Sequence, residues 1–301
     1  MNRYDLAIAY RIYPKVSKPA AGLPLAGDKL QLSEVCLRSL KHSLAGLRVK
    51  LWALLDGCPE AYADLFRKYF DERDLVLVPL DSMGNRATFE KQIDILLEQE
   101  ASDLVYFAED DYIYLPAQFP RLIEFLQACE DVHFVTPYDH PDCYNLRIHR
   151  HPKWMRVHGG HHWRTAASTC LTVLMRKQTL QKSEAIFRSY GRRNLDCSLW
   201  LSLTKKCVFA PVQFLRFAFL EPPFAKIMAK TWIYGWRQIL FEAPMQLWIP
   251  VPGFATHLDA QAMSPTIDWA AVIRKQAEAV VLESGQNKSY MESKSTSAVM
   301  D

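Results

Sequence analysis

The segment from Leu104 to Asp111 constrains the fold most strongly, because a run of apolar residues passes directly into three acids. The bulky apolar residues up to Ala108 predict a strand that is buried on both faces of a parallel sheet. The three acids stand where that strand ends. Adjacent carboxylates repel one another unless cations neutralise them, and oxygen ligands suit Mg²⁺ or Mn²⁺. The pattern predicts a metal site at the carboxyl edge of a sheet, with a solvated acidic turn as the alternative.

The composition excludes several classes of protein. Half of the 301 residues are hydrophobic, which indicates a folded globular chain, and a net charge of +3 does not indicate nucleic-acid binding. The seven cysteines are odd in number and form no C-x-x-C pair, which argues against a disulfide framework or a structural zinc site. We therefore expect a cytoplasmic protein without a signal peptide.

Apolar runs alternate along the chain with segments of helical periodicity, which predicts an α/β fold. Strands are expected near residues 6–10, 49–55, 75–80, 103–108 and 132–136, and helices near 31–44, 59–70, 87–99 and 120–129. The connections predict a mostly parallel sheet flanked by helices, with right-handed crossovers. A loop with proline and glycine is expected from Pro14 to Gly27.

The position of the acids suggests a family. The chain has no G-x-G-x-x-G after its first strand and no P-loop motif, so the usual dinucleotide and P-loop folds are not indicated. Glu109-Asp110-Asp111 after the fourth strand resembles the D-x-D-type motif of GT-A glycosyltransferases, most closely the family 2-like group, with Glu at the first position. The resemblance implies metal-dependent transfer of a sugar from a UDP- or GDP-sugar to a glycan or lipid-linked hydroxyl acceptor, with Mn²⁺ or Mg²⁺ as cofactor and inversion at the anomeric carbon.

The same resemblance divides the chain. It implies a single catalytic domain over residues 1–282, with a nucleotide-binding half at about 1–111 and an acceptor half at about 112–208. An aromatic and helical extension is expected at 209–282. The polar, Ser- and Lys-rich tail at 283–301 is expected to be disordered.

Candidate donor-site residues follow from the resemblance. It implies that Glu109, Asp111 and the late histidine His257 hold the metal. The residues implied to contact the nucleotide are Arg11, Asp56, Asn85, Arg86 and Asp110. A carboxylate accepts from base or ribose donors, and arginine pairs with phosphate. Strand-end capping, surface ion pairs and, for His257, a structural role remain the alternatives.

Asp196 is the candidate catalytic base. It stands in Arg192-Arg193-Asn194-Leu195-Asp196, which resembles the acidic turn that opens a helix after the acceptor region, although the usual paired acid is missing. In inverting members of the family the acid at this place removes the proton from the acceptor hydroxyl, a role that suits a carboxylate. A carboxylate that interacts with a helix N-terminus is the alternative interpretation.

Seven of the nine histidines lie between His133 and His162. We interpret this segment as a loop-rich acceptor region across the mouth of the sheet, with His162, Trp163 and Arg164 as acceptor contacts and Trp163 as a stacking face for a sugar. Ligation of zinc in a hydrolase is an alternative, but the spacing does not match H-E-x-x-H.

The segment 209–252 is rich in aromatic residues, yet its charges and prolines exclude a transmembrane span. Packing on the core or on a partner subunit is favoured over a lid or a peripheral membrane surface. For the whole chain, a sugar nucleotidyltransferase and a non-catalytic glycan- or nucleotide-binding module remain the alternatives to sugar transfer. A basic, glycine-rich loop after the first strand would favour the nucleotidyltransferase, but residues 14–27 contain only two glycines and two lysines.

Overall fold

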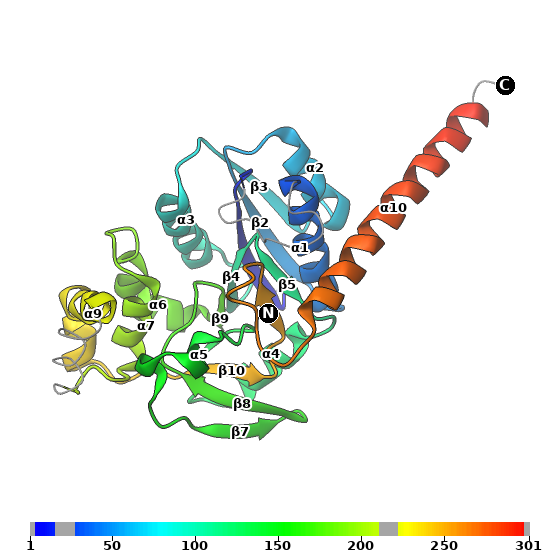
Figure 1. Cartoon of the computed structure of the whole chain (residues 1–301). Helices are drawn as coiled ribbons and strands as arrows, with labels where there is room; N and C mark the ends of the chain where they lie inside the picture. Colours follow the sequence, from blue (N-terminus) through cyan, green and yellow to red (C-terminus); the bar gives the residue numbers. More distant parts are fainter. Residues whose placement is uncertain (1–3, 16–27, 211–221, 298–301) are drawn as a thin grey trace.

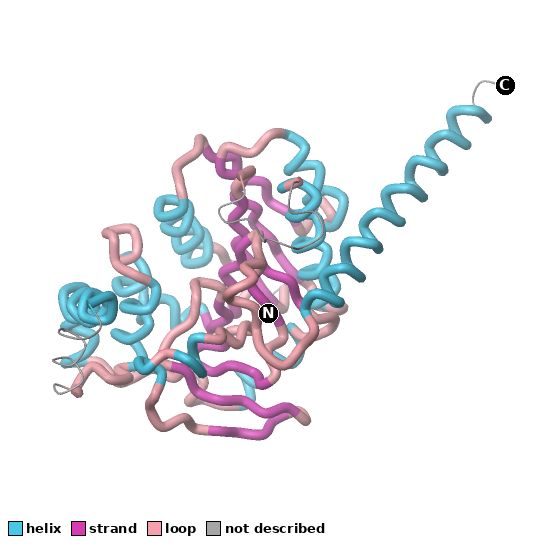
Figure 2. The backbone as a smooth tube through the Cα atoms, viewed as in Figure 1, coloured by secondary structure: helices cyan, strands magenta, loops and turns pink. Residues whose placement is uncertain are grey.

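The computed structural model describes residues 4–15, 28–210 and 222–297. Within these ranges a nine-stranded sheet has the order β3-β2-β1-β4-β9-β6-β10-β8-β7, and a second sheet pairs β11 with β5. Figure 2 shows the main sheet as a magenta layer through the middle of the molecule.

The main elements of the described ranges are eleven strands and nine α-helices. The strands are β1 (Leu6–Ile12), β2 (Val49–Asp56), β3 (Leu75–Leu80), β4 (Leu104–Glu109), β5 (Tyr112–Tyr114), β6 (Phe134–Val135), β7 (Met155–His158), β8 (His161–Ala166), β9 (Val173–Arg176), β10 (Leu247–Val251) and β11 (Ala255–His257). The helices are α1 (Lys29–Leu44), α2 (Glu60–Tyr69), α3 (Asn85–Glu98), α4 (Phe119–Ala128), α5 (Asp142–Asn145), α6 (Lys177–Arg188), α7 (Asp196–Thr204), α9 (Pro222–Phe241) and α10 (Trp269–Ser297), with a 3-10 turn at Arg147–His149.

The two faces of the sheet have separate cores because side chains alternate along a strand. Leu6, Ile8 and Tyr10 of β1 pack with α1, α2 and α4, whereas Ala7 and Ala9 pack with α3 and with the helices that follow β9. Small residues on the second face let α3 lie close to the strands. Figure 1 shows α1 and α2 on one side of the sheet and α3 on the other.

The predicted α/β fold class is confirmed. β3, β2, β1 and β4 are parallel. β2, β3 and β4 each follow a helix on the chain, and the ends of all four strands lie within a few residues of the predicted ones. Beyond β4 the directions mix, because β9 runs antiparallel to both β4 and β6. The carboxyl ends of β1, β2 and β4 therefore meet at one edge, where ligands bind in open α/β sheets.

The C-terminal part differs from the expectation in two ways. The segment 209–252 is divided, since α9 packs against α7 while β10 enters the main sheet between β6 and β8. The tail that was expected to be disordered from Glu283 onward continues α10 as far as Ser297 and points away from the body (Figure 1). Residues 298–301, most of the predicted loop 14–27 and residues 211–221 lie outside the described ranges. No helix in the described ranges has the length and apolarity needed to cross a bilayer.

Candidate active site

A cavity of about 350 Å³ opens at the carboxyl edge of the parallel strands. Most of the residues predicted for donor binding line it, namely Arg11, Asp56, Asn85, Glu109, Asp110 and Asp111. They come from β1, β2, the start of α3 and the end of β4. Arg86, the remaining nucleotide candidate from this part of the chain, is exposed on α3 outside the cavity lining.

Glu109 contacts the protein's own cation. Its carboxylate forms an ion pair with Arg11 and accepts a hydrogen bond from Thr172 Oγ1 at 2.8 Å. Arg11 also donates to the Asn85 carbonyl oxygen at 3.0 Å and lies over the Phe89 ring, with 5.5 Å from its guanidinium carbon to the ring centroid. Burial opposes its charge, but Glu109 raises the pKa of Arg11 overall. This pair therefore fixes the end of β4 to β1 and to the start of α3.

Asp110 has a different cation. Lys29 Nζ, at the start of α1, lies 2.6 Å from Asp110 Oδ2, and the Tyr13 amide donates to the same oxygen at 3.4 Å. Lys29 is held in place because Asp28 caps the helix by accepting from the Gln31 amide. Burial and the charge of the neighbouring acid raise the pKa of Asp110, while Lys29 opposes that change.

Asp111 and His257, far apart in the sequence, lie side by side. β11 pairs with β5 so that His257 is opposite Tyr112, and His257 Nε2 lies 3.0 Å from Asp111 Oδ2. The Leu258 amide also donates to the Asp111 carbonyl oxygen at 2.8 Å. Burial opposes both shifts, yet their hydrogen bond lowers the pKa of Asp111 and raises that of His257.

Each member of this pair has one buried atom of a type that binds divalent cations. Asp111 Oδ1 and His257 Nδ1 are buried and have no hydrogen-bond partner. Mg²⁺ in nucleotide sites commonly uses only one or two carboxylates and completes its shell with phosphate oxygens and water, and imidazole suits Mn²⁺. Glu109, which was predicted as a third ligand, is directed instead to Arg11 and Thr172. Within the described ranges no group of three or more acidic, histidine or cysteine side chains is arranged around one metal position.

Asp56 caps a turn. Its two carboxylate oxygens accept from the Met83 amide at 2.6 Å and the Gly84 amide at 2.9 Å. The capping alternative that the sequence left open is therefore present, and the buried carboxylate orders the turn that leads into α3. Asp56 also lines the cavity, so the turn that it orders forms part of the cavity wall.

Asp196 lies at the first position of α7 beside a second, smaller cavity of about 130 Å³. Its Oδ1 accepts from the Cys197 amide at 2.7 Å. Burial raises the pKa of Asp196, and the negative charge of Glu109 acts in the same direction. A carboxyl group with a raised pKa is a stronger base when it is ionised, which suits proton abstraction.

The second cavity contains buried polar atoms that have no partner. His140, His149 and Thr169 line it together with Asp196, and His149 Nδ1 and Thr169 Oγ1 form no hydrogen bond in the described structure. The charge of Glu109 acts on Asp196, and that of His257 lowers the pKa of His140, whose main shift comes from burial. Cys170 lines this second cavity, and Thr172, two residues further on, donates to Glu109 in the first cavity, so one short segment reaches both cavities.

The three predicted acceptor contacts do not line either cavity. His162, Trp163 and Arg164 lie on β8, which β9, β6 and β10 separate from β4. Trp163 is 1% exposed and stacks on Phe125 with ring centroids 4.0 Å apart, so it offers no open face to a sugar.

Arg164 is 3% exposed and forms an ion pair with Asp139, and His162 is exposed near the outer edge of the sheet. The structure therefore does not bring these three residues to either cavity, because they lie on a sheet strand rather than in a loop.

Sequence reasoning missed three side chains that organise the site. Lys29 and Thr172 contact the acids, and Gln92 Nε2 reaches from α3 to the carbonyl oxygens of Ala9 and Ala108 at 2.7 and 3.0 Å. The sequence did contain a signal for Gln92, because a glutamine stands there among the apolar positions of an amphipathic helix. Lys29 and Thr172 have no local pattern that distinguishes them.

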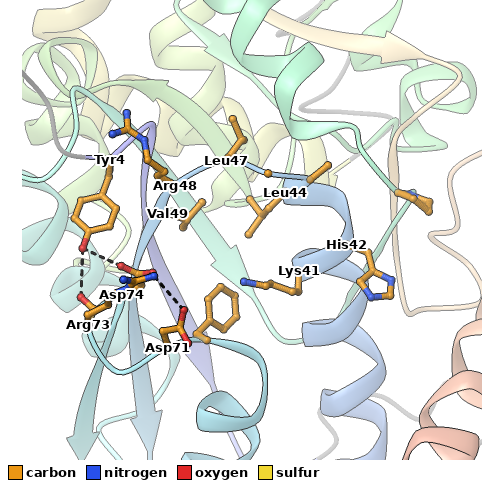
Figure 3. Close-up of a pocket in the computed structure, with 14 residues that line it drawn as sticks. Tyr4, Lys41, His42, Leu44, Leu47, Arg48, Val49, Asp71, Arg73 and Asp74 are labelled. Carbon is orange, nitrogen blue, oxygen red and sulfur yellow. Dashed lines mark hydrogen bonds and ion pairs between the residues drawn. The ribbon is translucent and has the colours of Figure 1, made fainter.

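A larger cavity of about 910 Å³ lies at the opposite, amino edge of the strands. Figure 3 shows its lining, in which the Tyr4 hydroxyl donates to Asp74 and to the Arg73 carbonyl oxygen. Arg48 pairs with Asp5, and Arg73 lies 3.6 Å from Asp71. None of the predicted catalytic, metal or nucleotide residues lines this cavity, so its size does not make it the candidate site.

The structure is similar to those of glycosyltransferases, as the motif resemblance led us to expect. One is the galactosyltransferase LgtC in complex with donor and acceptor sugar analogues (TM-score 0.44, 10% identity, 91% of this chain and 95% of that chain). Another is the mannosyltransferase PcManGT from Pyrobaculum calidifontis with GDP-Man and Mn²⁺ (TM-score 0.41, 13% identity, 77% of this chain and 70% of that chain).

A synthase is matched as well. This is the 4-diphosphocytidyl-2C-methyl-D-erythritol synthase from Anaerococcus prevotii (TM-score 0.39, 11% identity, 68% of this chain and 86% of that chain). No protein-family model and no curated protein matches the sequence. TM-scores and identities this low carry no conclusion about function, and the fold described above rests on the sheet topology itself.

Proposed function

We propose that this chain is a metal-dependent glycosyltransferase that moves a sugar from a UDP- or GDP-sugar to a hydroxyl acceptor, with inversion. One observation supports the proposal most strongly. Residues from the ends of β1, β2 and β4 and from the start of α3 line one cavity, and a second cavity with a carboxylate of raised pKa adjoins it. Transfer between a donor and an acceptor requires two such neighbouring sites.

The first cavity suits the donor. Asp111 and His257 would hold Mn²⁺ or Mg²⁺, which when bound supplies positive charge for the leaving diphosphate. Arg11 and Lys29 balance the other two acids, so that the cleft is not left with three uncompensated negative charges beside an anionic ligand. Asp56 keeps the turn before α3 in the shape that lines the cavity.

The second cavity suits the acceptor. Asp196 would take the proton of the acceptor hydroxyl while that oxygen bonds to the anomeric carbon and the carbon–oxygen bond to the diphosphate breaks. The attack and the departure occur on opposite sides of the carbon, which inverts it. Asp196 Oδ1 already accepts from the Cys197 amide, so Oδ2 is the oxygen that receives the proton. His149 and Thr169 provide unpartnered polar atoms for the hydroxyl groups of the acceptor.

We also propose a reducing, cytoplasmic location. All seven cysteines lie in the described part of the chain, and each is free of a disulfide bond.

A thermal-shift panel tests the donor proposal. UDP, GDP, TDP and CMP are each added with and without Mn²⁺, because a ligand that binds only the native state raises its melting temperature by mass action. We expect a rise with UDP or GDP that depends on Mn²⁺. If none of the nucleotides shifts the melting temperature in either condition, the proposal is wrong.

Product analysis distinguishes the alternatives. A glycosyltransferase releases nucleoside diphosphate from the nucleotide-sugar, slowly to water when the acceptor is missing. A nucleotidyltransferase would instead convert nucleoside triphosphate and sugar phosphate into nucleotide-sugar and pyrophosphate. Binding without either product would favour the non-catalytic module.

A further inference from the structure

Helix α9 is held firmly against the body by one of its faces. Ser202 Oγ donates to the Thr231 carbonyl oxygen at 3.2 Å, and Ser198 Oγ donates to the Ile227 carbonyl oxygen at 2.9 Å. A side chain at Gly235 would overlap the Ser202 hydroxyl, so the two helices approach as closely as glycine permits. The opposite face of α9 is therefore presented in a fixed orientation.

That outer face carries large apolar side chains in the open. Ile233 is 67% exposed, Trp236 45%, Leu240 53% and Phe241 73%. Their spacing places them on one side of a helix. A contiguous exposed group of this kind on a soluble protein marks an interaction surface rather than ordinary surface scatter.

The charged residues on the same face have one sign. Lys226, Lys230 and Arg237 lie among the apolar side chains, and residues 222–241 contain no acid. The Arg237 guanidinium carbon lies 5.3 Å from the centroid of the Trp236 ring, and Lys230 Nζ lies 5.9 Å from that of Tyr234. Aromatic residues and cations on one helix face, with the acids absent, are typical of helices that lie in a lipid–water interface.

The positive surface continues beyond the helix. The Tyr234 hydroxyl donates to the Arg192 carbonyl oxygen at 2.5 Å, and Lys230 donates to the Arg193 carbonyl oxygen, so this loop is attached to α9. Burial, together with the charges of Lys226, Arg86 and Arg193, lowers the pKa of Lys230. The cations of this loop and those of α9 therefore lie on one continuous part of the surface.

We propose that the outer face of α9 docks on an anionic membrane surface, with Trp236 and Phe241 in the interface and Lys226, Lys230 and Arg237 against the lipid headgroups. The positive charge of this face favours an anionic lipid surface as its partner, since an anionic leaflet attracts nearby cations. A second copy is disfavoured because a two-fold contact would place the same three cations against themselves. The inference rests on this surface alone and does not require that the chain transfers sugar.

Docking by this face has a consequence for the candidate site. Asn85 lines the donor cavity and donates from Nδ2 to the Tyr190 hydroxyl at 3.2 Å, three residues before the Arg193 carbonyl that accepts from Lys230 of α9. The side of the cleft nearest α9 would therefore lie toward the lipid.

Vesicle flotation of the full chain tests the proposal. The probes are vesicles of phosphatidylcholine alone and vesicles of phosphatidylcholine with phosphatidylglycerol. We expect the chain to float with the anionic vesicles at least about tenfold more strongly than with neutral ones, and less as salt is raised. Equal flotation with both compositions, or none with either, would overturn the proposal.

Matched variants locate the surface. Trp236→Ser combined with Phe241→Ser should weaken flotation about tenfold or more, because both side chains leave the interface. Trp154→Ser is the control, since Trp154 is 60% exposed and precedes β7 on another part of the molecule. An equal loss with the control would contradict the assignment to α9.

Charge variants provide a second measurement in case the apolar variant folds poorly. Lys226→Gln with Arg237→Gln should weaken binding to anionic vesicles and flatten its salt dependence. Arg274→Gln with Lys275→Gln removes the same charge from exposed positions on α10 and should change neither. If the apolar variant instead abolishes self-association measured without vesicles, the face is an interface between copies and the membrane proposal is wrong.

Discussion

At the scale of single residues, each acid of the triplet Glu109-Asp110-Asp111 has its own partner from a different element: Arg11, Lys29 and His257 respectively. Only Asp111 retains a buried oxygen without a partner, and it adjoins an imidazole. The three acids are adjacent in the sequence and look equivalent there, but their partners in the structure differ. Of the three acids, Asp111 is therefore the one whose replacement should lower the affinity for a metal ion most.

Asp111→Asn should abolish the Mn²⁺-dependent part of nucleoside diphosphate binding, because an amide is a poor ligand for the metal. The fold should persist, since Asn can still accept the hydrogen bond from His257. Titration by calorimetry with and without Mn²⁺ measures the effect, and Asp64→Asn on the exposed side of α2 is the control. Unchanged affinity in the presence of Mn²⁺ would show that Asp111 is not a ligand.

Asp196→Asn should leave nucleotide binding nearly unchanged and lower transfer by about 10²–10⁴-fold, the usual contribution of a positioned base. Asn can still accept from the Cys197 amide, so the start of α7 is preserved. Single-turnover measurements with a productive acceptor provide the rate.

The pH profile gives a second readout for the same residue. Because burial raises the pKa of Asp196 and a base acts when ionised, transfer by the unmodified chain should fall as the pH drops through a value above that of an ordinary aspartate. Near-normal turnover of the Asn variant, or a profile without that fall, would contradict the base assignment.

At the scale of elements, the turn between β2 and α2 has little freedom. Gly57 has a φ of +66°, and a side chain there would overlap the Ser82 hydroxyl in the turn that Asp56 caps. Two turns at the edge of the donor cavity are thus packed against each other.

Gly57→Ala should destabilise the protein by more than about 1–2 kcal/mol, the cost of a left-handed conformation alone. Gly46→Ala is the matched control, because Gly46 also has a positive φ but its added carbon would meet nothing within 4 Å. Chemical denaturation of both variants gives the difference that the Ser82 contact contributes. Equal losses of unfolding free energy in the two variants would mean that the turn containing Ser82 moves aside without an energetic penalty.

The same elements show what the sequence could and could not predict. β1 to β4 and α1 to α4 were predicted because each has an apolar pattern of one period, whereas the three-residue strand β5 was not. β11 was not predicted, since three residues are too few to show a periodicity. Its pairing with β5 depends on contacts between segments that are distant in the sequence. β8 was misinterpreted as a loop because its histidines resemble a polar segment, whereas Trp163 and Arg164 are buried by a neighbouring helix and an ion pair. Lys29 could not be found because nothing local to α1 indicates an acid on β4.

At the scale of the whole molecule, the stability should depend on pH through two buried histidines. Burial lowers the pKa of His149 and of His151 to about 4. An unfolded chain has histidines with a pKa of about 6.5, so below that pH it binds protons that the folded state does not.

The free energy of unfolding should therefore be insensitive to these groups above about pH 6.5 and should fall as the pH drops from there toward about 4. Urea unfolding at a series of pH values measures the slope. The double variant His149→Gln with His151→Gln should be less stable at neutral pH but have a shallower slope in this window. An identical slope would show that both histidines are already protonated or accessible in the folded state.

The pairing of β11 with β5 determines when, during synthesis of the chain, the candidate site can be completed. The ribosome delivers β1 to β4, and with them all three acids, well before His257 emerges. A nascent chain can fold this parallel half early, since domains form as their residues become available. Its Asp111 nevertheless lacks the imidazole until β11 has been synthesised and paired. Translation thus supplies His257 after all three acids, and a chain that stalls before residue 257 would carry the parallel strands without the Asp111–His257 pair.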